Sequence, residues 1–209
     1  MNTRKLFTST LAALALLALF TTPAALRASD VSGTATSITT SNNSVALALG
    51  SGASASIGSI MTRDNSNVSG TLTDNTTSNN SVALGLGSGA SASIGGIAIR
   101  GSTLGGQATS VTASNNSVAL ALGSGATARL GGILIKDGSN VSGRLSDVTV
   151  VNNSVALALG SGSDASIGGI EVAGSHFSGQ ASSVTAVSNT VAFDLGWFGR
   201  AHIGGIQIR

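Results

Sequence analysis

Side chains able to catalyse a reaction are few in this sequence of 209 residues. Its two histidines, His176 and His202, both lie near the end of the chain, and cysteine is absent. Nucleophilic catalysis by a serine needs a histidine and a carboxylate positioned around the hydroxyl. The serines and Asp194 follow no spacing of that kind, so we expect no enzymatic activity.

Patterns that bind metal ions are equally scarce. The sequence has no cysteine cluster, no histidine pair at helical spacing and no Asp-rich calcium loop, including the GGxGxD calcium repeat. We interpret the aspartates as turn-forming residues. We therefore expect neither a metal site nor a cofactor.

Basic side chains recur at one position of a repeated pattern, namely Arg63, Arg100, Lys136 and Arg209. Such a column could bind an acidic polysaccharide or extracellular DNA along the molecule, or it could be a solvated turn. Stacked like charges repel one another. Asp64 and Asp137 directly follow two of the four and could relieve that repulsion.

The last copy of the pattern differs from the others in its aromatic and charged side chains. Residues 197–202 read WFGRAH, whereas the corresponding residues 161–166 read SGSDAS. The residues concerned are Phe193, Trp197, Phe198, Arg200 and His202. They could belong to a terminal repeat that covers an exposed end, or form a docking patch for a secretion partner, a surface anchor or the next subunit.

All of these side chains lie within a sequence pattern that occurs five times. The string SNNSVALALGSGASASIGSI at 41–60 returns four times, lastly as VSNTVAFDLGWFGRAHIGGI at 187–206. Its first valine falls at Val45, Val82, Val118, Val155 and Val191, so the spacing alternates between 37 and 36 residues. A second period of 73 residues lies over the first, because 64–74 resembles 137–147. Fixed periods of this size are typical of stacked repeat proteins.

Within each copy, short segments alternate apolar and small polar residues. In the second copy these segments are 68–73, 81–86 and 90–100. Val82, Leu84 and Leu86 share one parity, which predicts a strand rather than a helix. The GSG at 87–89 predicts a turn, and the pair Gly95-Gly96 predicts a bulge or corner.

The fold expected from this pattern is all-β, a β-solenoid of five stacked repeats at about 30–63, 64–100, 101–136, 137–173 and 174–209. These repeats form a single domain, 29–209, in which small Val, Ile, Leu and Ala side chains fill thin layers. Each copy could make one coil of the solenoid or two coils of about 18 residues.

Three columns hold the same residue in all five copies. The asparagines are Asn43, Asn80, Asn116, Asn153 and Asn189, which stacking would place in a hydrogen-bonded ladder. The glycines are Gly33, Gly70, Gly106, Gly143 and Gly179, which would mark corners with positive φ. The threonines are Thr39, Thr76, Thr112, Thr149 and Thr185, whose hydroxyls on a flat surface could bind ice.

The first 28 residues have the layout of a Sec-type signal peptide: basic MNTRK, an apolar run at 6–20 and a small-residue site at Ala28. The run is short for a membrane-spanning helix, although an uncleaved anchor is the alternative. Cleavage near Ala28 removes three of ten basic residues and leaves seven against eight acidic ones, a formal charge of −1. We therefore expect a secreted protein with no membrane span after cleavage and no specific nucleic-acid partner.

These cysteine-free repeats, rich in Gly, Ser, Asn and Ala, resemble the subunits of bacterial functional amyloids of the curli and Fap types. The order VSG, Asn-rich turn, valine strand, Gly turn and GGI is closest to Fap-type repeats, and NNSVALALGSGASA is similar to head repeats of trimeric autotransporter adhesins. The resemblance implies self-association into an extracellular fibre for biofilm or surface adhesion, with an outer-membrane export partner or nucleator. The alternative is a monomeric surface-binding solenoid, an adhesin or an ice-binding module.

Overall fold

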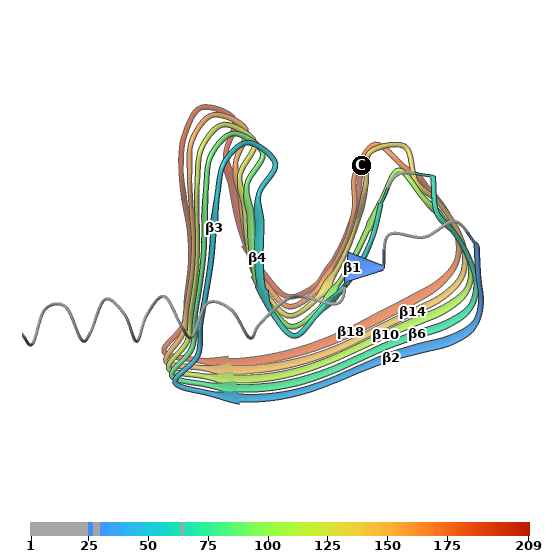
Figure 1. The fold of residues 1–209 in the computed structure, drawn as a ribbon, viewed down its shortest axis with the longest axis horizontal. Coiled ribbons are helices and arrows are strands. Elements are labelled where there is room, and N and C mark those ends of the chain that lie inside the picture. Colours follow the sequence, from blue (N-terminus) through green and yellow to red (C-terminus); the bar gives the residue numbers. More distant parts are fainter. Residues whose placement is uncertain (1–24, 27–29, 64) are drawn as a thin grey trace, which may run out of the picture.

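Every copy of the repeat folds into the same set of β-strands. The computed structural model describes residues 25–26, 30–63 and 65–209. Within these ranges every regular element is a β-strand, so the all-β prediction for the repeats is confirmed (Figure 1). The predicted signal-peptide helix falls on residues that lie mostly outside the described ranges.

Four strand levels follow one another in each repeat. The long strands have 13 residues each and are β2 (Asp30–Asn42), β6 (Asn67–Asn79), β10 (Thr103–Asn115), β14 (Asn140–Asn152) and β18 (His176–Ser188). The β3-level strands are β3 (Val45–Leu49), β7 (Val82–Leu86), β11 (Val118–Leu122), β15 (Val155–Leu159) and β19 (Val191–Leu195).

The remaining two levels are shorter. The β4-level strands are β4 (Ser54–Ile57), β8 (Ser91–Ile94), β12 (Thr127–Leu130), β16 (Asp164–Ile167) and β20 (Arg200–Ile203). The β5-level strands are β5 (Ile60–Thr62), β9 (Ile97–Arg100), β13 (Ile133–Lys136), β17 (Ile170–Val172) and β21 (Ile206–Ile208).

Strands of one level pair in parallel and in register with their counterparts in the next repeat. Val45 lies opposite Val82, and Val118 lies opposite both Val82 and Val155, so equivalent residues stack directly. Each copy is therefore one rung of the solenoid, and the alternative of two coils per copy is wrong. Five rungs stack into four parallel sheets, and β1 (Ala25–Leu26) adds a sixth strand beside β5.

A rung has two lobes above the long strand, as Figure 1 shows down the stack. One lobe lies between the β3 and β4 levels and is filled mainly by alanines with one isoleucine or leucine per rung. The other lies between the β5 level and the first half of the long strand and is filled by Ile, Leu and Val. Small inner side chains keep each lobe thin.

The corner between the β4 and β5 levels touches the long strand. Gly95 has φ +68, and a Cβ there would clash with Thr112 and Thr76. The predicted break at Gly95-Gly96 is confirmed, because β8 ends before it and β9 begins after it. The threonine column thus packs inward against the glycine corners, and Thr76, Thr112 and Thr149 are at most 1% exposed. The interpretation of this column as an ice-binding surface is wrong for that reason.

The glycine column has positive φ as predicted, but it lies inside the long strands rather than at corners. Gly70 has φ +137 and Gly143 has φ +141. A Cβ on Gly143 would collide with the carbonyl oxygen of Gly106 in the rung below. Close approach between rungs therefore requires glycine here.

Within the described residues, no helix is long and apolar enough to cross a membrane.

Candidate functional site

The asparagine ladder runs one residue earlier than the sequence suggested. Asn115 donates to Asn79 at 3.2 Å, and Asn152 donates to Asn115 at 3.2 Å. In the predicted column, only Asn189 and Asn153 share a side-chain hydrogen bond, at 3.1 Å. That column instead ends the long strands with φ between 48° and 53°, a left-handed conformation that asparagine tolerates.

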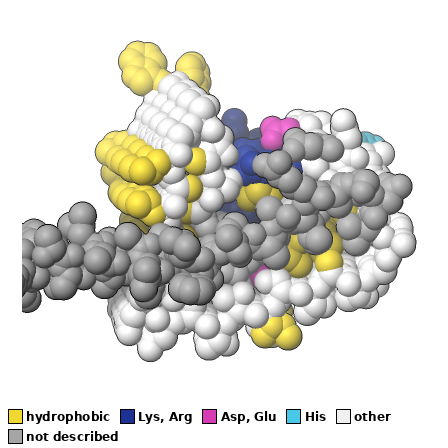
Figure 2. Space-filling model, viewed as in Figure 1, with side chains coloured by type: hydrophobic (Ala, Val, Ile, Leu, Met, Phe, Trp, Pro, Cys, Tyr) yellow, Lys and Arg dark blue, Asp and Glu magenta, His cyan; other side chains and the backbone are white. Residues whose placement is uncertain are grey.

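The basic column is not a simple solvated turn. Its side chains lie in the hollow between the lobes, where Figure 2 shows Lys and Arg side chains gathered. Arg63 donates to Ser54 at 2.5 Å, and Lys136 donates to Thr127 at 3.5 Å, so both reach from the β5 level to the β4 level. Arg129 reaches the other way, to the carbonyl oxygen of Ile97 at 3.3 Å.

Burial weakens the charged form of Arg100 and Lys136. It lowers the pKa of Arg100 to about 10, with further lowering by the charges of Arg129 and Arg63. It also lowers the pKa of Lys136 to about 8. Arg63, Arg100 and Asp137 help to line an open pocket of about 440 Å³. Among the described residues, no carboxylate forms an ion pair with Arg63, Arg100, Arg129 or Lys136.

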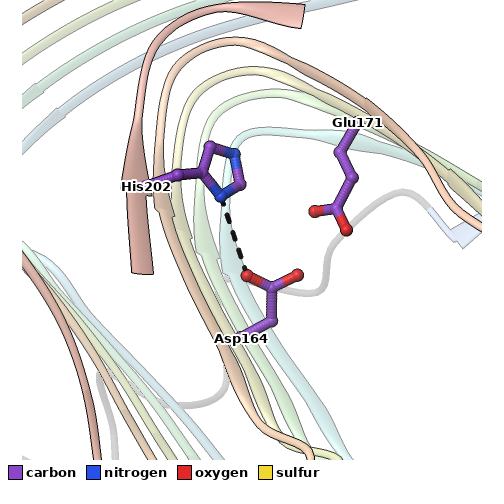
Figure 3. A group of neighbouring side chains, drawn as sticks. All are labelled: Asp164, Glu171 and His202. Carbon is purple, nitrogen blue, oxygen red and sulfur yellow. Dashed lines mark ion pairs between the residues drawn. The ribbon is translucent and has the colours of Figure 1, made fainter. Parts of the chain in front are cut away.

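The acidic side chains of the same hollow belong to the fourth rung. Asp164 on β16 and Glu171 on β17 face each other across it, and His202 on β20 points at Asp164 (Figure 3). His202 Nδ1 lies 3.9 Å from Asp164 Oδ1. The terminal Arg209 pairs with Glu171 and lies 3.9 Å from the other oxygen of Asp164.

Burial and the neighbouring Glu171 together raise the pKa of Asp164 to about 7. Burial also lowers the pKa of His202, which favours the neutral form of this imidazole. Asp164, Glu171 and His202 are of the types that bind divalent metals, and their ligand atoms lie within 4.8 Å of one another. Arg209 pairs with both carboxylates, and the buried Arg129 interacts with them electrostatically without an ion pair, so the cluster contains charges of both signs between the third and fifth rungs.

The five residues of the predicted docking patch do not form one surface, and Arg200 is the exposed first residue of β20. Trp197 and Phe198 lie on the turn after β19 and are 82% and 87% exposed. Phe193 lies on the outer face of β19, and His202 points into the hollow. The exposed core of the patch is therefore the Trp197–Phe198 turn.

Phe198 adopts a conformation that favours glycine. Its φ is +63, and the equivalent residues of the other four rungs are glycines with φ between +66 and +67. A bulky residue in the left-handed region costs on the order of 1 kcal/mol. An exposed aromatic side chain is thus held in this turn at the expense of stability.

Both ends of the stack leave strand edges without partners among the described residues. At the C-terminal end these are β18, β19, β20 and β21. At the other end they are β2, β3 and β4, because β1 pairs with β5. An open strand edge offers backbone N–H and C=O groups to another chain.

No protein-family model, curated protein or solved structure matches this chain. The architecture itself defines the class: an all-β solenoid with five stacked rungs.

Sequence reasoning missed Asp164, Glu171 and Arg129 as members of one cluster. They lie on three strands of two rungs and meet only through the fold. The available signal was the register, because the spacing of 36 residues between Asp164 and Arg200 places His202 opposite Ser166, two residues beyond the acid on the same face of the strand.

Proposed function

We propose that the chain is the subunit of a secreted fibre that grows by stacking copies rung on rung, as a structural element of biofilm matrix or surface attachment. The observation that carries this proposal is the pair of open ends, which both leave the long strand, the β3-level strand and the β4-level strand unpaired among the described residues. The likeness of the repeats to curli and Fap subunits supports the extracellular role.

The two ends match in register. Inside the molecule, β10 pairs with β14 over their full length, and β14 begins Asn-Val-Ser-Gly. β2 begins Asp-Val-Ser-Gly, and β18 has the Gly-Gln-Ala sequence of β10. A copy added to the end would therefore place β2 on β18 as β14 lies on β10. Gly33 would meet Gly179, and Thr39 would meet Thr185.

The direct test is the mature chain, residues 29–209, held at neutral pH. We expect filaments that bind thioflavin and give a fibre reflection near 4.8 Å along their axis. A chain that stays a soluble monomer would overturn the fibre proposal and support a monomeric surface-binding solenoid.

A single backbone N–H at the edge gives a sharper test. His176 donates its N–H to Ser139 in the fourth rung. N–H directions alternate along a strand, so the N–H of Ala181 points to the open edge. Ala181→Pro removes this donor without breaking a bond inside the monomer, and we expect at least tenfold slower elongation with an unchanged melting temperature. Ala181→Val keeps the N–H and is the matched control; equal elongation by the two variants would contradict growth at this edge.

A further inference from the structure

The β3-level strands turn their larger side chains outward. In β7, Ala83 and Gly85 are buried, whereas Val82, Leu84 and Leu86 are only partly covered, and β11 and β15 repeat this pattern. At the ends of the stack, where one neighbour is missing, Leu49 is 67% exposed and Leu195 is 58% exposed. The alternation is the reverse of a sheet that places small residues in water and large ones in its core.

The same choice is made in all five rungs. The outward residues, called here the aliphatic face, are Val45, Leu47, Leu49, Val82, Leu84, Leu86, Val118, Leu120, Leu122, Val155, Leu157, Leu159, Val191, Phe193 and Leu195. Every member is apolar, and equivalent residues stack in register. The result is a flat, uncharged surface on one side of the solenoid.

The surroundings of the aliphatic face argue against a lipid partner. Interfacial segments combine an apolar face with flanking Lys and Arg that meet anionic headgroups. Here the cations Arg63, Arg100, Arg129 and Lys136 lie in the hollow on the other side of the β4 level, where Figure 2 shows a group of Lys and Arg side chains. The turns beside the face carry small uncharged residues in the first four rungs, and only the fifth rung has Trp197, Phe198 and a single cation, Arg200, there.

We propose that the aliphatic face binds the aliphatic face of a second copy of this chain, in a neighbouring fibre. This inference rests on the proposed fibre function. Identical rungs give both faces the same repeat along the stack, so side chains of one face fit between rungs of the other and form a dry interface. A two-fold arrangement makes the surface its own complement.

The size of the face explains why stacking would come first. Five strands at about 4.8 Å and five residues at about 3.3 Å give an area of roughly 400 Å² per molecule. Two single copies would thus bury roughly 800 Å², below the 1,200–2,000 Å² typical of stable complexes. Stacked copies present a continuous face, and two copies on each side already reach that range. Lateral pairing is therefore a property of fibres and not of free subunits.

The test compares two lysine substitutions in the central rung. Leu120→Lys places a charge in the middle of the aliphatic face. Thr109→Lys places the same charge on the outer side of β10, at a position with similar partial exposure. The readout is the mass per unit length of fibres grown from each chain, measured by scanning transmission electron microscopy, together with thioflavin kinetics.

We expect wild-type and Thr109→Lys fibres to have twice the mass per length of Leu120→Lys fibres, while all three chains elongate. Equal mass per length for all three would overturn lateral pairing but leave axial growth intact. Loss of pairing in Thr109→Lys alone would place the contact on the long strands and also overturn it. Absence of fibres from the wild type would instead contradict the proposed function.

Leu120→Thr is a second variant that tests the same contact if the lysine variant fails to fold. Threonine favours strands and carries no charge, so the rung should form. We expect a mixture of single and paired fibres from this chain, with the paired fraction at least halved. An unchanged paired fraction would count against the proposal.

Discussion

At the scale of single residues, two buried aspartates explain the 73-residue period. Asp74 accepts a hydrogen bond from the backbone N–H of Gly96 at 2.8 Å, and Asp147 accepts one from Gly169 at 2.8 Å. The rung between them has Ser110 at this position. Carboxylates on alternate rungs fasten the glycine corner to the long strand without stacking like charges directly on one another. They are structural residues, more specific than the turn formers expected from the sequence.

The buried carboxyl of Asp74 should make stability depend on pH. Burial raises its pKa from 3.8 to about 6. Between these values the unfolded chain has lost the proton that the folded chain keeps, so stability falls as pH rises, by up to about 3 kcal/mol at neutral pH. Asp74→Asn keeps an oxygen for Gly96 and removes the titration. We expect it to flatten the unfolding free energy between pH 4 and 7, measured by urea denaturation.

The exposed Asp137 supplies the control for this prediction. Asp137→Asn removes the same charge from a surface position, so its pH profile should follow that of the wild type. If both variants flatten the profile equally, net charge and not the buried carboxyl would set the dependence.

At the scale of strands, the alternation of residue types predicted where the strands lie. It did not predict which of the two faces of a strand is buried. The predicted strand at 81–86 and the break at 95–96 agree with β7 and the corner after β8. The inner face could not be read because both parities of β7 are free of charge. Alanine and glycine turn inward since the lobe between the β3 and β4 levels is thin. The burial of Thr112 was equally hidden, because it depends on contact with Gly95 and Gly131 from other segments.

The glycines of the long strands should matter more for stability than the glycines of the turns, because they lie against the backbone of the neighbouring rung. In Gly143→Ala the new Cβ would meet the Gly106 carbonyl, so two rungs must separate. Gly162 lies in the same rung with φ +66, and nothing lies within 4 Å of a Cβ there. We expect Gly162→Ala to lower the unfolding free energy by about 1 kcal/mol and Gly143→Ala by about 3 kcal/mol or more, in urea titrations. Similar losses in both would show that the rungs tolerate an added methyl group.

At the scale of the whole molecule, the charges of the hollow form layers along the stack. Arg63, Arg100 and Lys136 occupy the first three rungs, and Asp164 and Glu171 occupy the fourth. The order of these layers depends on the register of the strands. The sequence therefore predicted the basic column but not the acidic residues that follow it in the fourth rung. The layers make the two ends of the molecule different and so give the stack a direction.

The Trp197–Phe198 turn should favour the fibre over the monomer. Replacing Trp197 by Ser and Phe198 by Gly restores the turn of the other rungs and relieves the φ of +63 at Phe198. We expect the monomer to gain about 1 kcal/mol, seen as a melting temperature about 2–4 °C higher, and fibre elongation to slow severalfold. Unchanged elongation with the same gain in stability would leave these aromatics as the cover of an exposed end.

The short strand β1 covers the N-terminal edge of one of the four sheets. It pairs Ala25 with Met61 and Leu26 with Thr62, at the edge of β5. Within the molecule, the strand on this side of β17 is β13, where Leu134 pairs with Glu171 and Ile135 with Val172, and in a growing stack the corresponding neighbour of β5 would be β21 of the copy before it. β1 thus holds the position that β21 of an incoming copy would take, and the predicted cleavage near Ala28 would remove it. While β1 is in place, the N-terminal edge of one sheet is occupied, and its removal would leave all four sheets open to an incoming copy at this end.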